Sequence, residues 1–127
     1  MRNLAGVVAL MLVAACGGSP SGPSGGGGGG GAENTITITS SGVSVSTLTV
    51  SQGSRVTFRN NDSRAHNMTS DPHPDHLNCP EINAVGLLPP GQSRETGNLN
   101  TIRTCGFHDH DDPPPAGNRW TGRIIIR

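Results

Sequence analysis

A short stretch near the C-terminus combines two kinds of donor atom. Residues 104–112 read Thr-Cys-Gly-Phe-His-Asp-His-Asp-Asp, so a thiol is followed by an imidazole three residues later and by a second imidazole after two more. Thiolate sulfur beside imidazole nitrogen is a donor set that suits copper or zinc. Cys105, His108 and His110 are therefore candidate metal ligands.

A fourth candidate ligand, His66, lies earlier in the chain. It follows a strand-like pattern at residues 55–59, and another such pattern at residues 122–126 follows the Cys–His stretch. This order predicts that His66 and residues 104–112 lie in loops that meet at one end of a small β-sandwich. We expect a single metal ion to be held where these loops meet.

The remaining histidines and the nearby acidic residues have plainer interpretations. Residues 69–86 contain three prolines, two histidines and one cysteine, with little periodicity. This composition favours a surface loop in which His73 and His76 are solvated and bind metal at most transiently. Three aspartates are expected either on a solvated loop face or beside a ligand imidazole that they orient: Asp109, Asp111 and Asp112.

Strand patterns predict the elements that must position these residues. Residues 35–39 alternate threonine and isoleucine, as expected for a strand with one buried face. No segment has a helical stripe, and the absence of tyrosine leaves isoleucine, valine and leucine to build the core of an all-β domain. A phase slip near Thr47 is typical of a bulge. Further strand patterns, separated by turns with Gly or Pro, lie at 43–46, 48–50, 55–59, 92–96, 100–104 and 122–127.

The N-terminal region resembles a bacterial export signal. Arg2 precedes an apolar run at residues 4–13, which is too short to span a membrane as a helix. Val-Ala-Ala-Cys at residues 13–16 resembles the lipobox, in which cleavage precedes a cysteine that is then acylated; ordinary signal cleavage is the alternative. We therefore expect a signal peptide at 1–15, lipidation of Cys16, and anchoring on the periplasmic or cell-surface side of a bacterial membrane.

The rest of the chain divides into a tether and one domain. Residues 16–32 are rich in Gly, Ser and Pro, bury little apolar area, and are predicted to link the domain flexibly to the lipid. Residues 33–127 form the predicted folded domain. The formal net charge is +0, which gives no indication of a nucleic-acid-binding surface, and we expect a monomer.

Four segments of the domain resemble, in this order, the cupredoxins, the family of plastocyanin-like blue copper proteins. Residues 56–62 with His66-Asn67 resemble the strand that carries the first copper histidine. Residues 88–93, Leu-Pro-Pro-Gly-Gln-Ser, resemble a turn before the penultimate strand pair. Residues 105–108, Cys-Gly-Phe-His, resemble the segment that supplies a thiolate and a second imidazole, and residues 122–126 resemble the final strand.

The resemblance, which covers residues 34–127, implies a Greek-key β-sandwich of about eight strands with one copper ion. It implies His66, Cys105 and His108 as ligands, and electron transfer to a redox partner protein rather than enzymatic catalysis. Plastocyanin-like members also place an axial methionine after the second histidine, whereas no methionine follows His108 here. His110, a backbone carbonyl or an open position would take the axial role.

A disulfide is the main alternative for Cys105. With Cys16 acylated, Cys79 and Cys105 remain in a compartment where cysteines are usually paired. Their bond would remove the thiolate, and the chain would then hold or deliver copper at a pale site. The copper would rest on histidines alone: His66, His108 and His110, joined by His73 or His76.

Two further interpretations stay open. Gly-Phe-His-Asp-His at residues 106–110 also resembles the ligand segment of copper–zinc superoxide dismutases, but that family needs further histidines downstream, and none follows His110. A metal-free scaffold module is the other interpretation, because a β-sandwich does not by itself fix a function.

Overall fold

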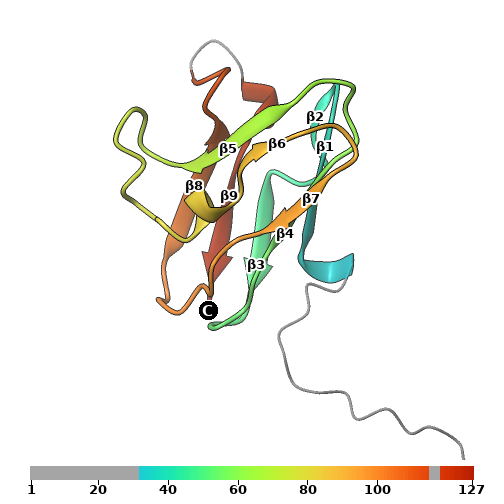
Figure 1. The fold of residues 1–127 in the computed structure, drawn as a ribbon. Helices are drawn as coiled ribbons and strands as arrows, with labels where there is room; N and C mark the ends of the chain where they lie inside the picture. Colours follow the sequence, from blue (N-terminus) through green and yellow to red (C-terminus); the bar gives the residue numbers. More distant parts are fainter. Residues whose placement is uncertain (1–31, 115–117) are drawn as a thin grey trace, which may run out of the picture.

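Two β-sheets stacked face to face make up the domain (Figure 1). This computed structural model describes residues 32–114 and 118–127. The predicted signal peptide, Cys16 and all but the last residue of the predicted tether lie outside the described residues. Within the two described ranges, no helix has the length and apolar character needed to cross a membrane.

The first sheet has four strands in the order β2-β1-β4-β7. β1 (Thr35–Thr39) pairs with β2 (Gly42–Val43) in antiparallel fashion and with β4 (Thr57–Asn60) in parallel fashion. β7 (Ser93–Glu95) pairs antiparallel with the other side of β4. Burial alternates along β1 and β4, so one face of this sheet turns toward the core.

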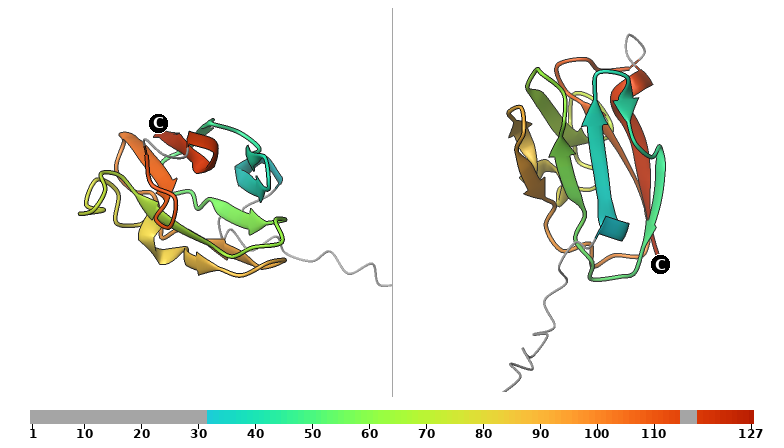
Figure 2. Two further views of the ribbon diagram at one scale, coloured as in Figure 1. Left: turned by 90° about the horizontal axis from the view of Figure 1, so that it is seen from above. Right: turned by 90° about the vertical axis from the view of Figure 1, so that its right-hand side faces the viewer.

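The second sheet has five strands in the order β3-β9-β8-β5-β6. β3 and β9 are parallel, and the other neighbours are antiparallel. Figure 2 shows the sandwich from above and from the side. The strands are β3 (Thr47–Val50), β5 (His66–Ser70), β6 (Gly86–Leu88), β8 (Thr104–Asp109) and β9 (Thr121–Ile126). Among the described residues, three short 3-10 helices accompany the sheets: η1 (Ala32–Asn34), η2 (Ile82–Ala84) and η3 (Asn118–Trp120).

Apolar side chains from both sheets meet between the layers. Ile36 and Ile38 of β1 and Ile124 of β9 are fully buried. The rings of Phe58 on β4 and Phe107 on β8 meet edge to face, with centroids 5.2 Å apart, and so join the two sheets. This burial of mainly aliphatic side chains provides the principal stabilisation of the domain.

The prediction of an all-β sandwich is confirmed, although the described residues form nine strands rather than about eight. The phase slip near Thr47 has another cause than the predicted bulge. β2 ends at Val43 in the first sheet and β3 begins at Thr47 in the second, so the slip marks where the chain crosses between sheets. The predicted strand at 100–104 is wrong except for Thr104, which begins β8.

Two segments predicted as loops are strands instead. His66 begins β5, and residues 104–109 form β8, which lies between β9 and β5. Polar side chains hid this strand in the sequence, because His108 and Asp109 occupy buried positions where apolar residues are usual. Most of the predicted ligands therefore lie within strands, and the pairing of these strands, rather than the conformation of loops, determines their positions.

Candidate metal centre

β5 and β8 lie side by side, and their register decides which side chains share a face. Met68 lies opposite Asp109, and Thr69 lies opposite His108. His66 and Met68 are buried on the inner face of β5, so Thr69 points to the outer face. Asp109 therefore lies on the inner face of the second sheet, and His108 lies on its outer face.

Four histidines converge beside β8 and form what we call the histidine cluster: His73, His76, His108 and His110. One ring nitrogen from each histidine lies within 4.8 Å of the others. His108 belongs to β8 and His110 follows it, whereas His73 and His76 come from the segment between β5 and η2. Converging imidazole nitrogens are a donor set for one transition-metal ion.

The segment at residues 71–81 lies against β8 because several bonds tie it there. The Asp71 backbone N–H donates to the Gly106 carbonyl at 3.0 Å, and Cys79 forms a disulfide with Cys105. A Cβ atom at residue 106 would collide with the Asp71 carboxylate, so glycine at this position permits the close approach. Figure 1 shows the segment as the loop that leaves β5 and passes beside β8.

Hydrogen bonds fix the protonated nitrogen in two of the four rings. His76 Nδ1 lies 2.8 Å from the Ser70 carbonyl oxygen, which can only accept, so Nδ1 donates and Nε2 of the neutral ring is unprotonated. This Nε2 lies 2.9 Å from His110 Nδ1. His108 Nδ1 donates to Asp71 Oδ1 at 2.6 Å, which makes Nε2 the unprotonated nitrogen of the neutral His108 ring. Both rings thus present the form of imidazole that metals bind.

Exposure differs across the histidine cluster. His108 is fully buried, His76 and His110 are half-buried, and His73 is exposed. Partial desolvation, reinforced by the neighbouring imidazoles, lowers the pKa of His73 and so favours the neutral ring. A pocket of about 330 Å³, lined in part by His73 and His108, opens beside the cluster.

The fold of this chain is similar to that of solved cupredoxin structures, although its sequence matches no known family. No protein-family profile matches the chain, and no curated protein matches it in sequence. A methionine-to-alanine mutant of amicyanin in the Cu(I) state is 16% identical, with a TM-score of 0.57 over 73% of this chain and 80% of that one. A purple cupredoxin from Nitrosopumilus maritimus is 19% identical, with a TM-score of 0.55 over 73% of this chain and 98% of that one. The fold is that of the cupredoxins.

Two of the four predicted ligands lie in the histidine cluster of this cupredoxin-like domain: His108 and His110. Cys105 is bonded to Cys79, as the disulfide alternative predicts. A disulfide sulfur is not a thiolate, so the interpretation of Cys105 as a thiolate ligand is corrected. His66 lies on the inner face of the second sheet, apart from the cluster.

His73 and His76 are the two cluster members that the main interpretation left as solvated loop residues, because of their Pro-rich surroundings, and that only the disulfide alternative offered as copper ligands. A signal for them was nevertheless present. The two histidines are three residues apart, just before Cys79. A Cys79–Cys105 bond holds Cys79 beside the Cys–His stretch. His73 and His76 precede Cys79 by only a few residues, so the bond also brings them close to His108 and His110.

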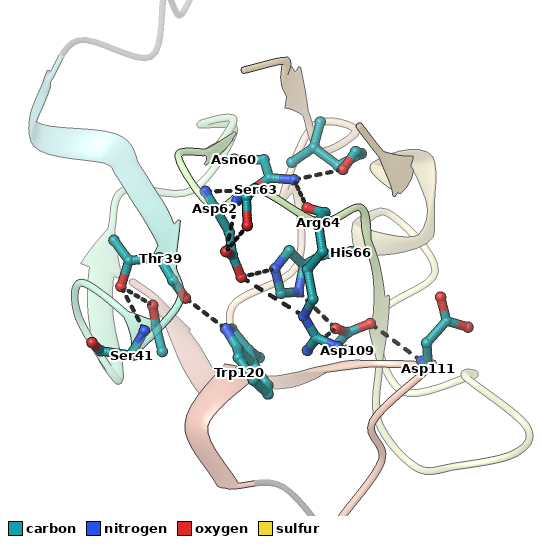
Figure 3. Close-up of polar contacts among 12 residues, drawn as sticks. Thr39, Ser41, Asn60, Asp62, Ser63, Arg64, His66, Asp109, Asp111 and Trp120 are labelled. Atoms are coloured by element: carbon teal, nitrogen blue, oxygen red, sulfur yellow. Dashed lines mark hydrogen bonds and ion pairs between the residues drawn. The ribbon is translucent and has the colours of Figure 1, made fainter. Parts of the chain in front are cut away.

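His66 lies in a buried group of charged side chains inside the cupredoxin-like sandwich (Figure 3). Its Nδ1 is 2.7 Å from Asp109 Oδ2, and its Nε2 is 2.9 Å from Asp62 Oδ2. Since both ring nitrogens face carboxylates, neither is directed toward the histidine cluster. Of the two alternatives for Asp109, the solvated loop face is wrong: the carboxylate is fully buried and lies beside an imidazole, that of His66.

Proposed function

We propose that this cupredoxin-like chain binds one copper ion through the histidine cluster and holds or delivers it. The observation that carries the proposal is the convergence of four imidazole nitrogens, contributed by His73, His76, His108 and His110, to within 4.8 Å of one another. Copper in one of the similar amicyanin structures supports the choice of metal, since the shared fold accommodates that ion there.

The donor set fits copper. Imidazole nitrogen suits copper, zinc, nickel and iron, and among first-row divalent ions at a given nitrogen site Cu²⁺ binds most tightly. Neighbouring ligand nitrogens, each about 2.0 Å from an ion, lie about 3 Å apart. The 2.9 Å between His76 Nε2 and His110 Nδ1 matches this spacing, and an ion bound to both nitrogens would displace the proton that they share in the metal-free chain.

Hydrogen bonds outside the ligand set orient two of the rings. Asp71 accepts from His108 Nδ1, and the Ser70 carbonyl accepts from His76 Nδ1, so each ring would coordinate through Nε2. A histidine that donates its second nitrogen to a carboxylate or carbonyl is a more basic and better-oriented ligand. The chain thus holds these two rings in fixed orientations before an ion binds.

The absence of a thiolate at Cys105 favours holding or delivery over rapid electron transfer. Blue-copper electron-transfer sites depend on a cysteine thiolate among the ligands, and Cys105 is in the disulfide with Cys79. Copper at this site would be a redox-active cation bound strongly by nitrogen ligands. The chain would pass the ion to an acceptor protein rather than act as an enzyme.

We also propose that the chain acts outside the cytoplasm, as a monomer attached to a bacterial membrane by lipid on Cys16. The Cys79–Cys105 disulfide supports export, because disulfides persist in oxidising compartments. The lipobox-like residues 13–16 support the anchor. A copper-accepting protein and the membrane are the proposed partners, and nucleic acid is not.

Titration of the purified protein with Cu(II), followed by calorimetry and visible absorption, tests the proposed copper site. We expect one tightly bound ion per chain, weak visible absorption, and tighter binding of Cu(II) than of Zn(II). The His108→Ala/His110→Ala variant should lose this binding, whereas the Asp75→Asn control, which changes an exposed carboxylate in the same segment, should keep it. Equal binding by both variants, or preference for Zn(II), would contradict the proposal.

A further inference from the structure

The buried surroundings of His66 require an unusual state of its ring. Asp109 Oδ2 lies 2.7 Å from Nδ1, and Asp62 Oδ2 lies 2.9 Å from Nε2 (Figure 3). Carboxylate oxygens accept hydrogen bonds, so both ring nitrogens must donate, whereas a neutral imidazole carries a single N–H. The geometry therefore describes a buried imidazolium between two carboxylates.

A second cation completes the charge balance of this group. The guanidinium of Arg64 lies 3.7 Å from a carboxylate oxygen of Asp62 and 3.7 Å from one of Asp109. Its central carbon lies over the Trp120 ring, 4.2 Å from the ring centroid. The Arg64 side chain is 48% exposed, so it balances the second carboxylate charge from the surface while His66 balances the first from inside.

Asp109 connects this group to the histidine cluster. It lies between His108 and His110 in the sequence, with its carboxylate on the inner face of the sheet. Its Oδ1 accepts from the Asn67 N–H at 3.0 Å and from the Asp111 N–H at 3.2 Å. The Asn67 carbonyl accepts from the His110 N–H at 2.7 Å, so the Asn67 backbone links the Asp109 carboxylate to His110.

We propose that His66 is a positioning residue for the metal site: by holding the Asp109 carboxylate from inside the sandwich, it sets the directions of the His108 and His110 rings on the other side. The inference rests on the proposed copper-binding function. It gives a role to the histidine that resembles a copper ligand in sequence yet contacts no member of the histidine cluster in the structure. Asp62 holds the opposite side of the His66 ring, and its pKa is lowered chiefly by that hydrogen bond.

The first test uses the metal-free protein, so that its result does not depend on copper binding. Long-range proton–nitrogen NMR of the imidazoles should show both nitrogens of His66 protonated. In the His66→Gln variant, whose amide can donate to one carboxylate only, the ring signals of His108 and His110 should shift. A single protonated nitrogen in His66, or unchanged His108 and His110 signals in the variant, would overturn the proposal.

The second test measures Cu(II) binding to the folded variants. We expect His66→Gln to weaken Cu(II) binding roughly 10–100-fold and to alter its electron paramagnetic resonance spectrum, as changes in outer-shell partners of a metal site do. Thr96→Val is the matched control, because it removes a buried hydroxyl that bonds to Val56 and Gly97 after β7 in the other sheet. The control should lose stability while keeping the wild-type spectrum and affinity.

The outcomes separate the two proposals. If the wild-type protein binds no copper, the proposed function fails, and the NMR comparison alone decides the role of His66. If His66→Gln does not fold, Asp62→Asn replaces it, because this variant keeps an acceptor oxygen for His66 while removing one charge. Asp62→Asn should shift the His108 and His110 signals in the same way but less, and unchanged signals in this variant would also overturn the proposal.

Discussion

His66 and His108 project from opposite faces of the second sheet, although they lie on adjacent strands. The register that sets Thr69 opposite His108 puts His66 among the inner, buried positions of β5. A one-residue change in the pairing of β5 with β8 would place His66 and His108 on the same face, since neighbouring residues of a strand point to opposite faces. The pairing of β5 with β8 therefore separates the charged group around His66 from the histidine cluster.

The first prediction concerns Asp71, which orients the His108 ring. We expect Asp71→Asn to weaken Cu(II) binding about 10–100-fold, because an amide accepts the His108 N–H less strongly than a carboxylate does. Gly106→Ala should have a similar effect by displacing the Asp71 carboxylate. Calorimetric titration measures both. The Gly97→Ala control, whose new Cβ would meet its nearest neighbour at 3.4 Å, should bind like the wild type.

The second prediction concerns His73 and His76, which belong to the segment at residues 71–81. Each should be needed for full affinity, so the alanine variants should lose more than the 10–100-fold typical of outer-shell changes. Competition titrations against a copper chelator measure the loss. A chain that binds copper equally well without His76 would show that the ion sits elsewhere.

The third prediction concerns the Cys79–Cys105 disulfide. The bonded cysteines are 26 residues apart, and closing a loop of this length in the unfolded chain stabilises the folded state by about 3 kcal/mol. Urea denaturation should show this loss in the Cys79→Ala/Cys105→Ala variant. Copper affinity should fall with it, because the segment bearing His73 and His76 loses a covalent tie to β8. Full affinity in the folded variant would show that hydrogen bonds alone hold the segment.

The fourth prediction concerns acid stability. The hydrogen bond from His66, opposed by burial, lowers the pKa of Asp62 below its ordinary value of 3.8. The unfolded chain therefore binds the proton at this site more readily, and the contribution of Asp62 to folding is present above pH 4 and is lost as the pH falls through its lowered pKa. Thermal unfolding between pH 2 and pH 6 should show a shallower acid decline in Asp62→Asn than in the wild type, and parallel curves would refute this assignment.

The fifth prediction concerns Cys16. In a bacterial host, the full chain should fractionate with membranes and carry acyl groups that mass spectrometry detects on Cys16. The Cys16→Ser variant should leave the membrane fraction, because the predicted anchor is the lipid. Copper binding by the released protein should be unchanged. Membrane attachment of that variant would point to a different anchor.

The sequence predicts the framework better than the metal site, and the reason is visible in individual strands. β1 alternates threonine with two fully buried isoleucines, so its pattern reports its burial directly. β8 buries His108 and Asp109, whose partners come from β5 and from the segment that follows it. Because those partners are 37 and 43 residues away in the chain, no local pattern reveals them.

The state of Cys105 is another feature of the site that local sequence patterns could not decide. The residues allowed either a thiolate or a bond at Cys105, and the spacing of the cysteines did not decide between them. The decision comes from the fold, which brings the α-carbons of Cys79 and Cys105 to 5.7 Å, within the usual range for a disulfide. His73 and His76 join the site through the same approach of their segment to β8.

The missing side chain at Gly106 has a consequence for how this site would vary among related chains. Only a residue without a Cβ leaves space there for the Asp71 carboxylate, which in turn holds the His108 ring. Positions 71 and 106 should therefore change together: homologues that keep the aspartate should keep the glycine, and those with a larger residue at 106 should have lost the aspartate. An alignment of such chains would thus distinguish, at two positions, lineages that retain an oriented copper ligand from those that have only the sandwich.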